Sequence, residues 1–281
     1  MFIERTVKSL HPGGFHPLVY SEFAGDPART VVCVHGLSRN GRDFDWLAQA
    51  LAADGFRVIC PDMPGRGRSP AFSNPAWYNY PQYMADMVAL IAHLQVDKVD
   101  WVGTSMGGII GMTLASQKDH PIRKMVINDI GTFIPKEALE RIKQYVSLNP
   151  SYSSWDSYYE AFKKRQQTFG LQTEEEWEYL ARVSAEQTVD GKYRLAYDPK
   201  VAFGLESAGH VTDMNLWPLW SQINLPMLLL RGGDSDVLPA ETLEQMKAGK
   251  DARTMTFQGV GHAPALMNKE QIGVIRDFLK S

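Results

Sequence analysis

The hydrophobic positions of this chain follow two periods that alternate along the sequence. Short apolar runs, such as residues 30–34 and 56–60, are bounded by Gly, Pro and Asp, which is typical of strands buried on both faces. Between such runs, apolar residues recur at helical spacing, as in residues 80–94. Strands that alternate with helices predict an α/β fold with a mostly parallel central sheet and helices on both faces. The expected strands are 2–9, 17–23, 30–34, 56–60, 99–102, 124–128, 226–231 and 253–258, and the expected helices are 44–52, 80–94, 106–115, 137–148, 155–169, 174–188, 241–248 and a closing helix that buries Ile272, Ile275, Phe278 and Leu279.

The alternation breaks between residues 133 and 213, where helical stretches occur without a convincing buried strand and only residues 193–197 suggest a short extended piece. This segment holds 13 of the chain's 30 aromatic residues. We therefore expect a core domain of residues 1–132 and 214–281 and an inserted helical cap of residues 133–213. An excess of aromatic residues suits a lid over an apolar pocket, although most of them must pack the insertion onto the core.

Composition excludes several classes of protein. A chain of 281 residues with 44% hydrophobic residues, 22% charged residues and a net charge of −3 resembles an ordinary globular protein and has no basic run that would indicate nucleic-acid binding. No signal peptide and no apolar run of about 20 residues is evident, so we expect a cytoplasmic protein without a membrane partner. The two cysteines, Cys33 and Cys60, lie in expected buried strands and are predicted to be free thiols. No Cys or His cluster has metal-ligand spacing.

One junction carries the strongest chemical signal. Gly103-Thr104-Ser105-Met106-Gly107 separates an expected strand from an expected helix and has the pattern G-x-S-x-G. A serine on so sharp a turn needs strained backbone angles, and the close passage of strand and helix leaves room only for glycine at Gly103 and Gly107. The turn exposes the hydroxyl near a helix N-terminus, which predicts that Ser105 is a nucleophile.

Three further loops follow strands of the same expected sheet: residues 35–38, 232–236 and 261–262. Since ligands bind at the carboxyl ends of strands in open α/β sheets, we expect these loops to meet the Ser105 turn. His262 follows the last strand, and a neutral imidazole accepts a serine proton near pH 7. His262 is therefore the predicted general base.

The order of nucleophile, acid and base on this pattern of strands resembles the α/β-hydrolase superfamily, in particular its cap-bearing serine hydrolases. The resemblance covers nearly the whole chain and implies an α/β-hydrolase fold whose cap follows the strand that ends near Asn128. It is carried by His35-Gly36, the loop from Asp62 to Ser69, Gly103 to Gly108, Asp236 and Gly261-His262.

The resemblance also implies an acid that holds the second nitrogen of His262. In the family this residue usually lies three positions after a glycine and just before an apolar residue, and Asp236 fits that place in Gly233-Asp234-Ser235-Asp236-Val237. Asp234, in the same loop, is an alternative. Asp129 is another, because some family members take the acid from the strand that ends at Asn128.

The expected oxyanion hole combines the backbone N–H of Met106 with that of Leu37, to which the family pattern points. His35 and Gly36 are expected to shape the Leu37 loop rather than to act in catalysis. The loop of residues 62–69 is expected to brace the site, with Arg66 and Arg68 paired to nearby carboxylates.

These residues predict a serine hydrolase of the carboxylesterase type (EC 3.1.1) that cleaves a small or medium ester through an acyl-enzyme, with no cofactor. A carbon–carbon bond hydrolase of ring-cleavage products is the alternative within the family, but such enzymes usually carry Asn at Thr104 and Trp at Ala263. A ligand-binding receptor on the same fold is a second alternative. The acyl and alcohol groups, and the choice between monomer and homodimer, are left open.

Overall fold

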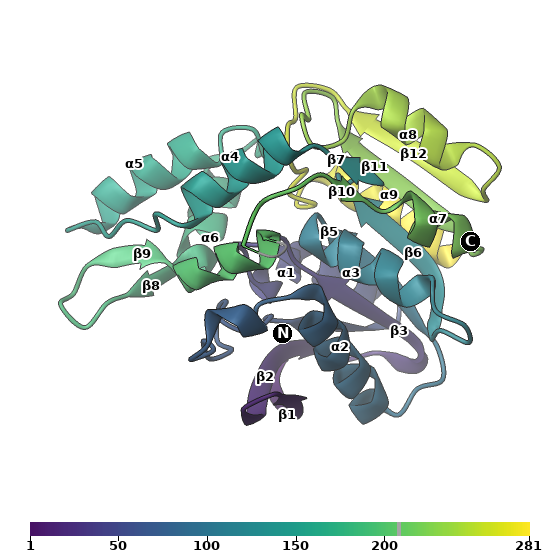
Figure 1. Cartoon of the computed structure of the whole chain (residues 1–281), viewed down its shortest axis with the longest axis horizontal. Coiled ribbons are helices and arrows are strands. Elements are labelled where there is room, and N and C mark those ends of the chain that lie inside the picture. Colours follow the sequence, from purple (N-terminus) through teal and green to yellow (C-terminus); the bar gives the residue numbers. More distant parts are fainter. Residues whose placement is uncertain (207–208) are drawn as a thin grey trace.

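The computed structural model describes residues 1–206 and 209–281, and its central element is an eight-stranded sheet of order β1-β2-β4-β3-β5-β6-β11-β12 (Figure 1). The first two strands form an antiparallel hairpin, and β2 pairs antiparallel with β4. All later neighbours are parallel, as the alternation of strands and helices predicts. The strands are β1 (Ile3–His11), β2 (Gly14–Phe23), β3 (Asp26–Val34), β4 (Phe56–Pro61), β5 (Val99–Thr104), β6 (Ile122–Asn128), β11 (Met227–Gly232) and β12 (Ala252–Phe257).

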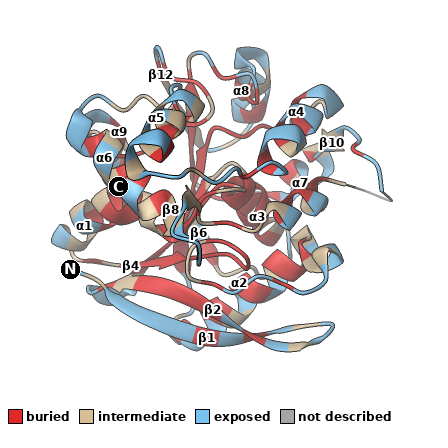
Figure 2. Ribbon diagram, turned by 90° about the vertical axis from the view of Figure 1, so that its left-hand side faces the viewer, coloured by how far each residue is buried: buried red, intermediate tan, exposed pale blue. Residues whose placement is uncertain are grey.

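Successive residues of the central strands belong to two hydrophobic cores, one on each face of the sheet. In β3, Val31 and Cys33 pack with α1 and α9, whereas Val32 and Val34 pack with α2 and α3. Burial on both faces explains the apolar runs in the sequence, and most residues of β3, β5, β6 and β11 are accordingly buried (Figure 2). The α-helices outside residues 133–213 are α1 (Asp45–Ala53), α2 (Tyr80–Leu94), α3 (Met106–Ala115), α7 (Trp217–Gln222), α8 (Ala240–Lys247) and α9 (Lys269–Lys280).

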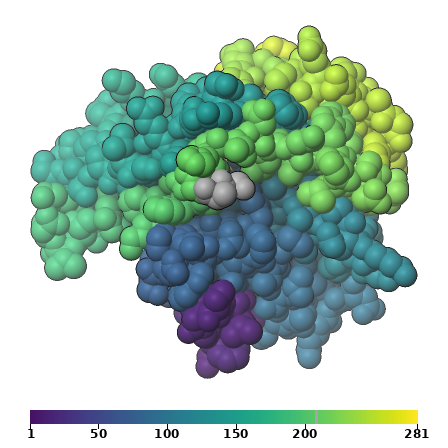
Figure 3. Space-filling view, viewed as in Figure 1, coloured from purple at the N-terminus to yellow at the C-terminus, as the bar shows by residue number. Residues whose placement is uncertain are grey.

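The insertion of residues 133–213 leaves the sheet after β6 and returns before α7. Its two ends are joined by a short antiparallel ribbon in which β7 (Phe133–Ile134) pairs with β10 (Met214–Asn215). Most of the insertion extends to one side of the molecule, where it forms a continuous body in the space-filling view (Figures 1 and 3). Its elements are α4 (Lys136–Val146), α5 (Trp155–Arg165), α6 (Glu174–Ser184), the hairpin of β8 (Ala185–Gln187) and β9 (Tyr193–Leu195), and the 3-10 helix η3 (Pro199–Leu205).

The expected elements are present, and the differences lie mainly in the insertion. The helix expected over 155–169 ends earlier, at Arg165. The helix expected over 174–188 ends at Ser184, because Ala185 adopts extended backbone and pairs with Leu195. Sequence periodicity missed α7, which has only six residues. It also missed the two-residue strands β7 and β10, because segments this short contain no full period.

The packing of α3 against the sheet depends on two glycines. A Cβ on Gly103 would lie 2.3 Å from the carbonyl oxygen of Gly107, and a Cβ on Gly107 would lie 2.0 Å from the carbonyl oxygen of Val34. Both clashes involve backbone atoms, which cannot move aside as a flexible side chain can. The expectation that only glycine fits at these positions is therefore confirmed. Separately, no helix in the described part of the chain is both long and apolar enough to cross a membrane.

Replacement of Gly107 tests this constraint. We expect Gly107→Ala to lower the free energy of unfolding by about 2 kcal/mol or more, because the methyl group would force α3 away from β3. Gly273→Ala is the matched control, since Gly273 lies in α9 with no atom within 4 Å of an added Cβ. It should raise stability by about 0.5–1 kcal/mol through helix propensity. Urea unfolding of both variants measures the difference, and equal effects would contradict the close-packing account.

Candidate active site

Ser105 occupies the turn between β5 and α3 in a backbone conformation that few side chains adopt. Its φ of 51° and ψ of −113° place a non-glycine residue at positive φ. Such a conformation costs on the order of 1–3 kcal/mol and persists only where the surroundings enforce it. The enforcing contacts include the hydrogen bond from the Ser105 N–H to the Asn128 carbonyl oxygen at 3.0 Å. The strained turn that the G-x-S-x-G pattern predicts is thus confirmed.

A chain of hydrogen bonds links Ser105 to His262 and Asp129. The Nε2 atom of His262 lies 3.0 Å from the Oγ of Ser105, and its Nδ1 atom lies 2.9 Å from Oδ2 of Asp129. The side chain of Asp129 is fully buried, and that of His262 is 16% exposed. A hydroxyl, an imidazole and a buried carboxylate in this order have the geometry with which a base removes a serine proton.

The prediction that Asp236 holds His262 is wrong in this structure. Asp236 forms an ion pair with Arg141, and 54% of its side chain is exposed. Asp234 is also exposed, and its N–H donates to the Val260 carbonyl oxygen. Asp129, the alternative from the preceding strand, occupies the predicted place of the acid.

The position of Asp129 follows from the order of the strands. It comes directly after β6, which lies beside β11 in the sheet, and its φ of 56° turns the chain sharply at that point. Its Oδ1 atom accepts a hydrogen bond from the N–H of Gly232, the last residue of β11, at 2.9 Å. The carboxylate of Asp129 therefore lies at the end of β11. Asp236 lies four residues after Gly232, and its carboxylate is paired with Arg141 instead.

Sequence reasoning missed Asn128, the last residue of β6, which also supports the site. The fully buried Asn128 donates its side-chain amide to Oγ1 of Thr104 at 3.0 Å and to the carbonyl oxygen of Pro264 at 2.8 Å. It thus joins the strand before Ser105 to the loop that carries His262. The available signal was a polar Asn-Asp pair immediately after a buried apolar run.

The loop after β3 lies against Ser105. A Cβ on Gly36 would be 3.7 Å from the Cβ of Ser105, which places the peptide of Leu37 near the hydroxyl. Within the described residues, neither the Leu37 N–H nor the Met106 N–H donates a hydrogen bond. Two unused backbone donors next to a serine hydroxyl are the components from which an oxyanion hole is made.

His35 braces this loop from inside the protein. Its Nδ1–H donates to the Gly36 carbonyl oxygen at 2.7 Å, and its Nε2 accepts the Met63 N–H at 2.9 Å. These two bonds require the neutral imidazole, and burial lowers the pKa of His35 to about 3. The expected supporting role of His35 therefore agrees with the contacts of this residue.

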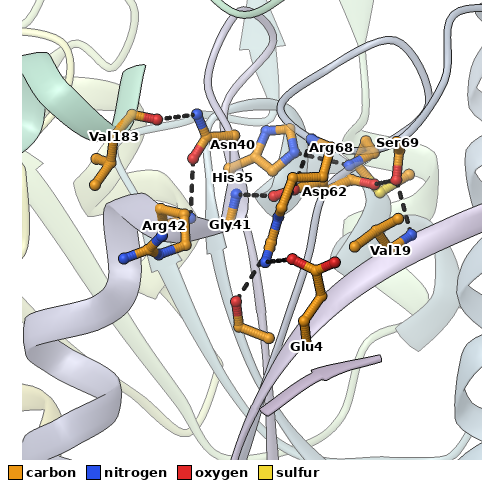
Figure 4. Close-up of polar contacts among 12 residues, drawn as sticks. Glu4, Val19, His35, Asn40, Gly41, Arg42, Asp62, Arg68, Ser69 and Val183 are labelled. Carbon is orange, nitrogen blue, oxygen red and sulfur yellow. Dashed lines mark hydrogen bonds and ion pairs between the residues drawn. The ribbon is translucent and has the colours of Figure 1, made fainter. Parts of the chain in front are cut away.

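The loop of residues 62–69 also supports the site, through a polar network shown in Figure 4. Asp62 accepts the N–H of Gly41 at 2.7 Å and the Nε–H of Arg68 at 2.7 Å. The Ser69 hydroxyl donates to the Asp62 carbonyl oxygen and accepts the Val19 N–H. The expected pairing of Arg68 with carboxylates is confirmed, because it contacts both Asp62 and Glu4.

The expected pairing of Arg66 with a carboxylate is wrong. This fully buried guanidinium donates to the carbonyl oxygens of Leu37 at 2.8 Å and Pro64 at 2.7 Å, and its Nη2 lies 3.5 Å from the sulfur of Met106. No ion pair joins Arg66 to a carboxylate within residues 1–206 and 209–281. The side chain instead contacts both residues whose backbone amides are unused. It reaches Leu37 through the carbonyl oxygen and Met106 through the sulfur.

A cavity of about 530 Å³ opens onto Ser105 and His262. Its volume lies in the range of small-molecule sites. The loop after β3 and the insertion form most of its wall, and the insertion contributes Arg141, Ile142, Tyr145, Arg165, Gln166 and Phe169. Among the residues that the structure describes, no group of three or more His, Cys, Asp or Glu side chains could hold a metal ion.

Comparison with known proteins identifies the family of the chain. A family model described as the alpha/beta hydrolase fold matches residues 29–268. The chain belongs to this family. This α/β hydrolase is 41% identical to a 3-hydroxybutyrate-oligomer hydrolase of Cupriavidus necator, with 97% of the chain and 96% of the relative aligned. It is 26% identical to an esterase of Escherichia coli K12, over 83% and 85% of the two chains.

Solved structures show the same architecture. An alpha/beta hydrolase from Novosphingobium aromaticivorans superposes with a TM-score of 0.89 at 32% identity, covering 99% of this chain and 98% of the other. The resemblance read from the sequence is therefore confirmed at the level of family and fold.

Separate replacement of Asp129 and of Asp236 by Asn tests the assignment of Asp129 as the acid. We expect Asp129→Asn to lower kcat for an activated ester by about 10⁴-fold, because the amide would favour the wrong imidazole tautomer. Asp236→Asn should change kcat by less than about 10-fold, since an exposed ion pair contributes little. Steady-state kinetics on p-nitrophenyl butyrate compares the variants, and a larger loss in Asp236→Asn would restore the original prediction.

The buried imidazole of His35 should make stability depend on pH. Its pKa is about 3 in the folded protein and about 6.5 when unfolded, so between these values the unfolded state binds one more proton. The free energy of unfolding should therefore fall as the pH decreases from 6.5 towards 3, by up to about 1.4 kcal/mol per pH unit from this group.

The comparison for this effect is His35→Gln, which keeps one donor and one acceptor but does not titrate. Urea unfolding at pH 7, 6, 5 and 4.5 should give a shallower slope for the variant than for the wild type. Parallel slopes would show that His35 is protonated without penalty in the folded state.

Proposed function

We propose that this α/β hydrolase cleaves carboxylic esters by serine catalysis, with Ser105 as nucleophile, His262 as base and Asp129 as the residue that holds the base. The observation that carries the proposal is the continuous set of hydrogen bonds from Asp129 through His262 to Ser105. The Leu37 and Met106 amides are proposed as the two donors to the negative oxygen of the tetrahedral intermediate.

The proposed reaction has two halves. Nε2 of His262 accepts the proton of Ser105 as Oγ attacks the ester carbonyl, and it then delivers this proton to the departing alcohol. The acyl group remains on Ser105 until His262 removes a proton from water, which attacks the acyl carbonyl. The intermediate then releases the acid, and His262 returns the proton to Oγ of Ser105. Asp129 fixes Nδ1–H of the imidazole, so that Nε2 is the free base in both halves.

We further propose short oligomers of a hydroxy acid, such as those of 3-hydroxybutyrate, as the substrate class. This is supported by 41% identity along nearly the whole length of the Cupriavidus necator oligomer hydrolase. A hydroxy-acid oligomer consists of carboxylic esters joined head to tail, so the same serine chemistry applies to each bond. A cavity of about 530 Å³ suits a few such units rather than a polymer surface.

The insertion is proposed to act as a fixed lid over Ser105. Backbone hydrogen bonds tie it to the catalytic loops, because Gly261 N–H donates to the Thr168 carbonyl oxygen at 2.7 Å and Gly67 N–H donates to that of Ala196 at 2.7 Å. A lid held in this way excludes bulk water and limits the size of the ligand. The departures at Thr104 and Ala263 leave carbon–carbon bond hydrolysis as the less favoured function.

The decisive experiment combines the nucleophile with the proposed substrate. The wild type should release 3-hydroxybutyrate from its synthetic dimer and trimer, and Ser105→Ala should lower kcat by several orders of magnitude while keeping the fold. Thr113→Ala, near the other end of the helix that begins after Ser105, controls for the loss of a hydroxyl. Products are followed by liquid chromatography. The proposed function would be refuted if Ser105→Ala kept more than about a tenth of wild-type kcat, which is far above the residual activity of an enzyme with a broken triad. Ligand binding without turnover would favour the receptor alternative.

A further inference from the structure

Two arginines of the insertion line the cavity that contains Ser105. Arg141 lies on α4, and Arg165 is the last residue of α5. Hydrolysis of a neutral ester requires no cation in this position, because backbone amides are the candidate donors to the reacting oxygen. Asp234 and Asp236 also line the cavity, and Asp236 is paired with Arg141. The charge that favours an acidic group elsewhere on the ligand is therefore mainly that of Arg165.

Arg165 is held in place without being neutralised. Its Nη2 donates to the hydroxyl of Tyr197 at 3.1 Å and to the carbonyl oxygen of Tyr145 at 3.4 Å. The guanidinium also lies 5.1 Å and 5.8 Å from the centroids of the Tyr145 and Tyr197 rings. In the described part of the chain, no ion pair connects Arg165 to a carboxylate. The contacts fix the direction of the side chain and leave its Nε and Nη1 donors free for a ligand.

The residues beside Arg165 add donors to the same wall. Gln166 is only 5% exposed and lines the cavity, yet its side-chain amide makes no hydrogen bond with any residue that the structure describes. Arg141 is paired with Asp236, but about half of each side chain is exposed. An ion pair in contact with solvent is weak, so a ligand anion can share the guanidinium.

A third arginine in the cavity wall provides a contrast. The charge of Arg39 is neutralised within the protein, because its Nε and Nη2 donate to the Asp43 carboxylate at 2.8 Å and 2.7 Å. Its Nη2 also donates to the Ser184 hydroxyl. Arg39 therefore links the loop after β3 to the insertion, whereas Arg165 has no such carboxylate partner among residues 1–206 and 209–281.

We propose that Arg165, assisted by Arg141 and Gln166, forms a subsite for the free carboxylate of the substrate. Planar guanidinium groups bind carboxylates through paired, charge-assisted hydrogen bonds, which matches the fixed and unpaired state of Arg165. The inference rests on the proposed function and makes it more specific. The ligand is an ester that carries its own acid group, and the bond cleaved is near that acid end, because both sites share one cavity.

The first test measures binding without turnover. The ligands are the 3-hydroxybutyrate dimer with a free carboxylate and the same dimer as its terminal methyl ester, each titrated calorimetrically into Ser105→Ala. The free acid should bind more tightly, on the order of 10- to 100-fold. In Ser105→Ala combined with Arg165→Met, the ratio of the two affinities should fall to about 1. Equal affinity of Ser105→Ala for the two ligands would overturn the proposal.

The second test measures selectivity in catalysis. The readout is the ratio of kcat/KM for the two dimers, which a uniform loss of active protein does not change. Arg165→Met should lower this ratio at least about 10-fold, mainly through KM for the acid, and Arg165→Lys should restore part of it. Arg182→Met is the matched control, since Arg182 lies on α6 of the same insertion and pairs with Glu178. Equal losses on both dimers in Arg165→Met would mean a structural role only.

The two proposals fail in different ways. If the acid subsite is wrong, the wild type still cleaves both dimers in a Ser105-dependent manner, but without preference for the free acid. If the ester hydrolysis is wrong, neither dimer is cleaved, and the calorimetric preference of Ser105→Ala still decides whether Arg165 binds a carboxylate.

Discussion

The close approach of helix α3 to the sheet is the constraint on which the site depends. Gly107 lets the helix pass the carbonyl of Val34 at a distance that no side chain permits, and Gly103, in β5, lets the strand pass the carbonyl of Gly107 equally closely. The chain can make this approach only through a sharp turn, so Ser105 is forced to a positive φ. The hydroxyl is thereby held at the edge of the sheet, where the loops after β3, β6 and β12 meet it.

Those loops are held together by hydrogen bonds between buried polar groups. Asn128 links the turn at Ser105 to the loop of His262, Asp129 links His262 to the end of β11, and His35 links two loops as a neutral imidazole. Each of these groups is restricted to positions that keep its hydrogen bond, because an unsatisfied polar group in the interior is costly. The result is a rigid frame in which small displacements of one loop affect the others.

Two arginines beside the catalytic loops carry a shielded charge that is not paired with an opposite charge in the described residues. Arg66 is buried against backbone carbonyls beside the proposed oxyanion hole, and Arg165 is packed on tyrosines at the wall of the cavity. Both are places where a negative charge is proposed to arrive, on the reacting oxygen in one case and on the substrate carboxylate in the other. A positive charge that is not neutralised within the protein attracts an anion to the adjacent site and stabilises it there.

The sequence by itself determined the order of strands and helices, the location of the insertion and the places of Ser105 and His262. These follow from local signals: apolar period, glycines at a tight turn, and a histidine just after a strand. It did not determine the acid, since Asp129, Asp234 and Asp236 all follow strands that end at the same edge. Only the tertiary structure decided among them, because the neighbour relation of β6 and β11 and the left-handed turn at Asp129 set which carboxylate reaches the imidazole. The same holds for Arg66, because its contacts with the Leu37 carbonyl and the Met106 sulfur join residues 29 and 40 positions apart, and no local pattern encodes such contacts.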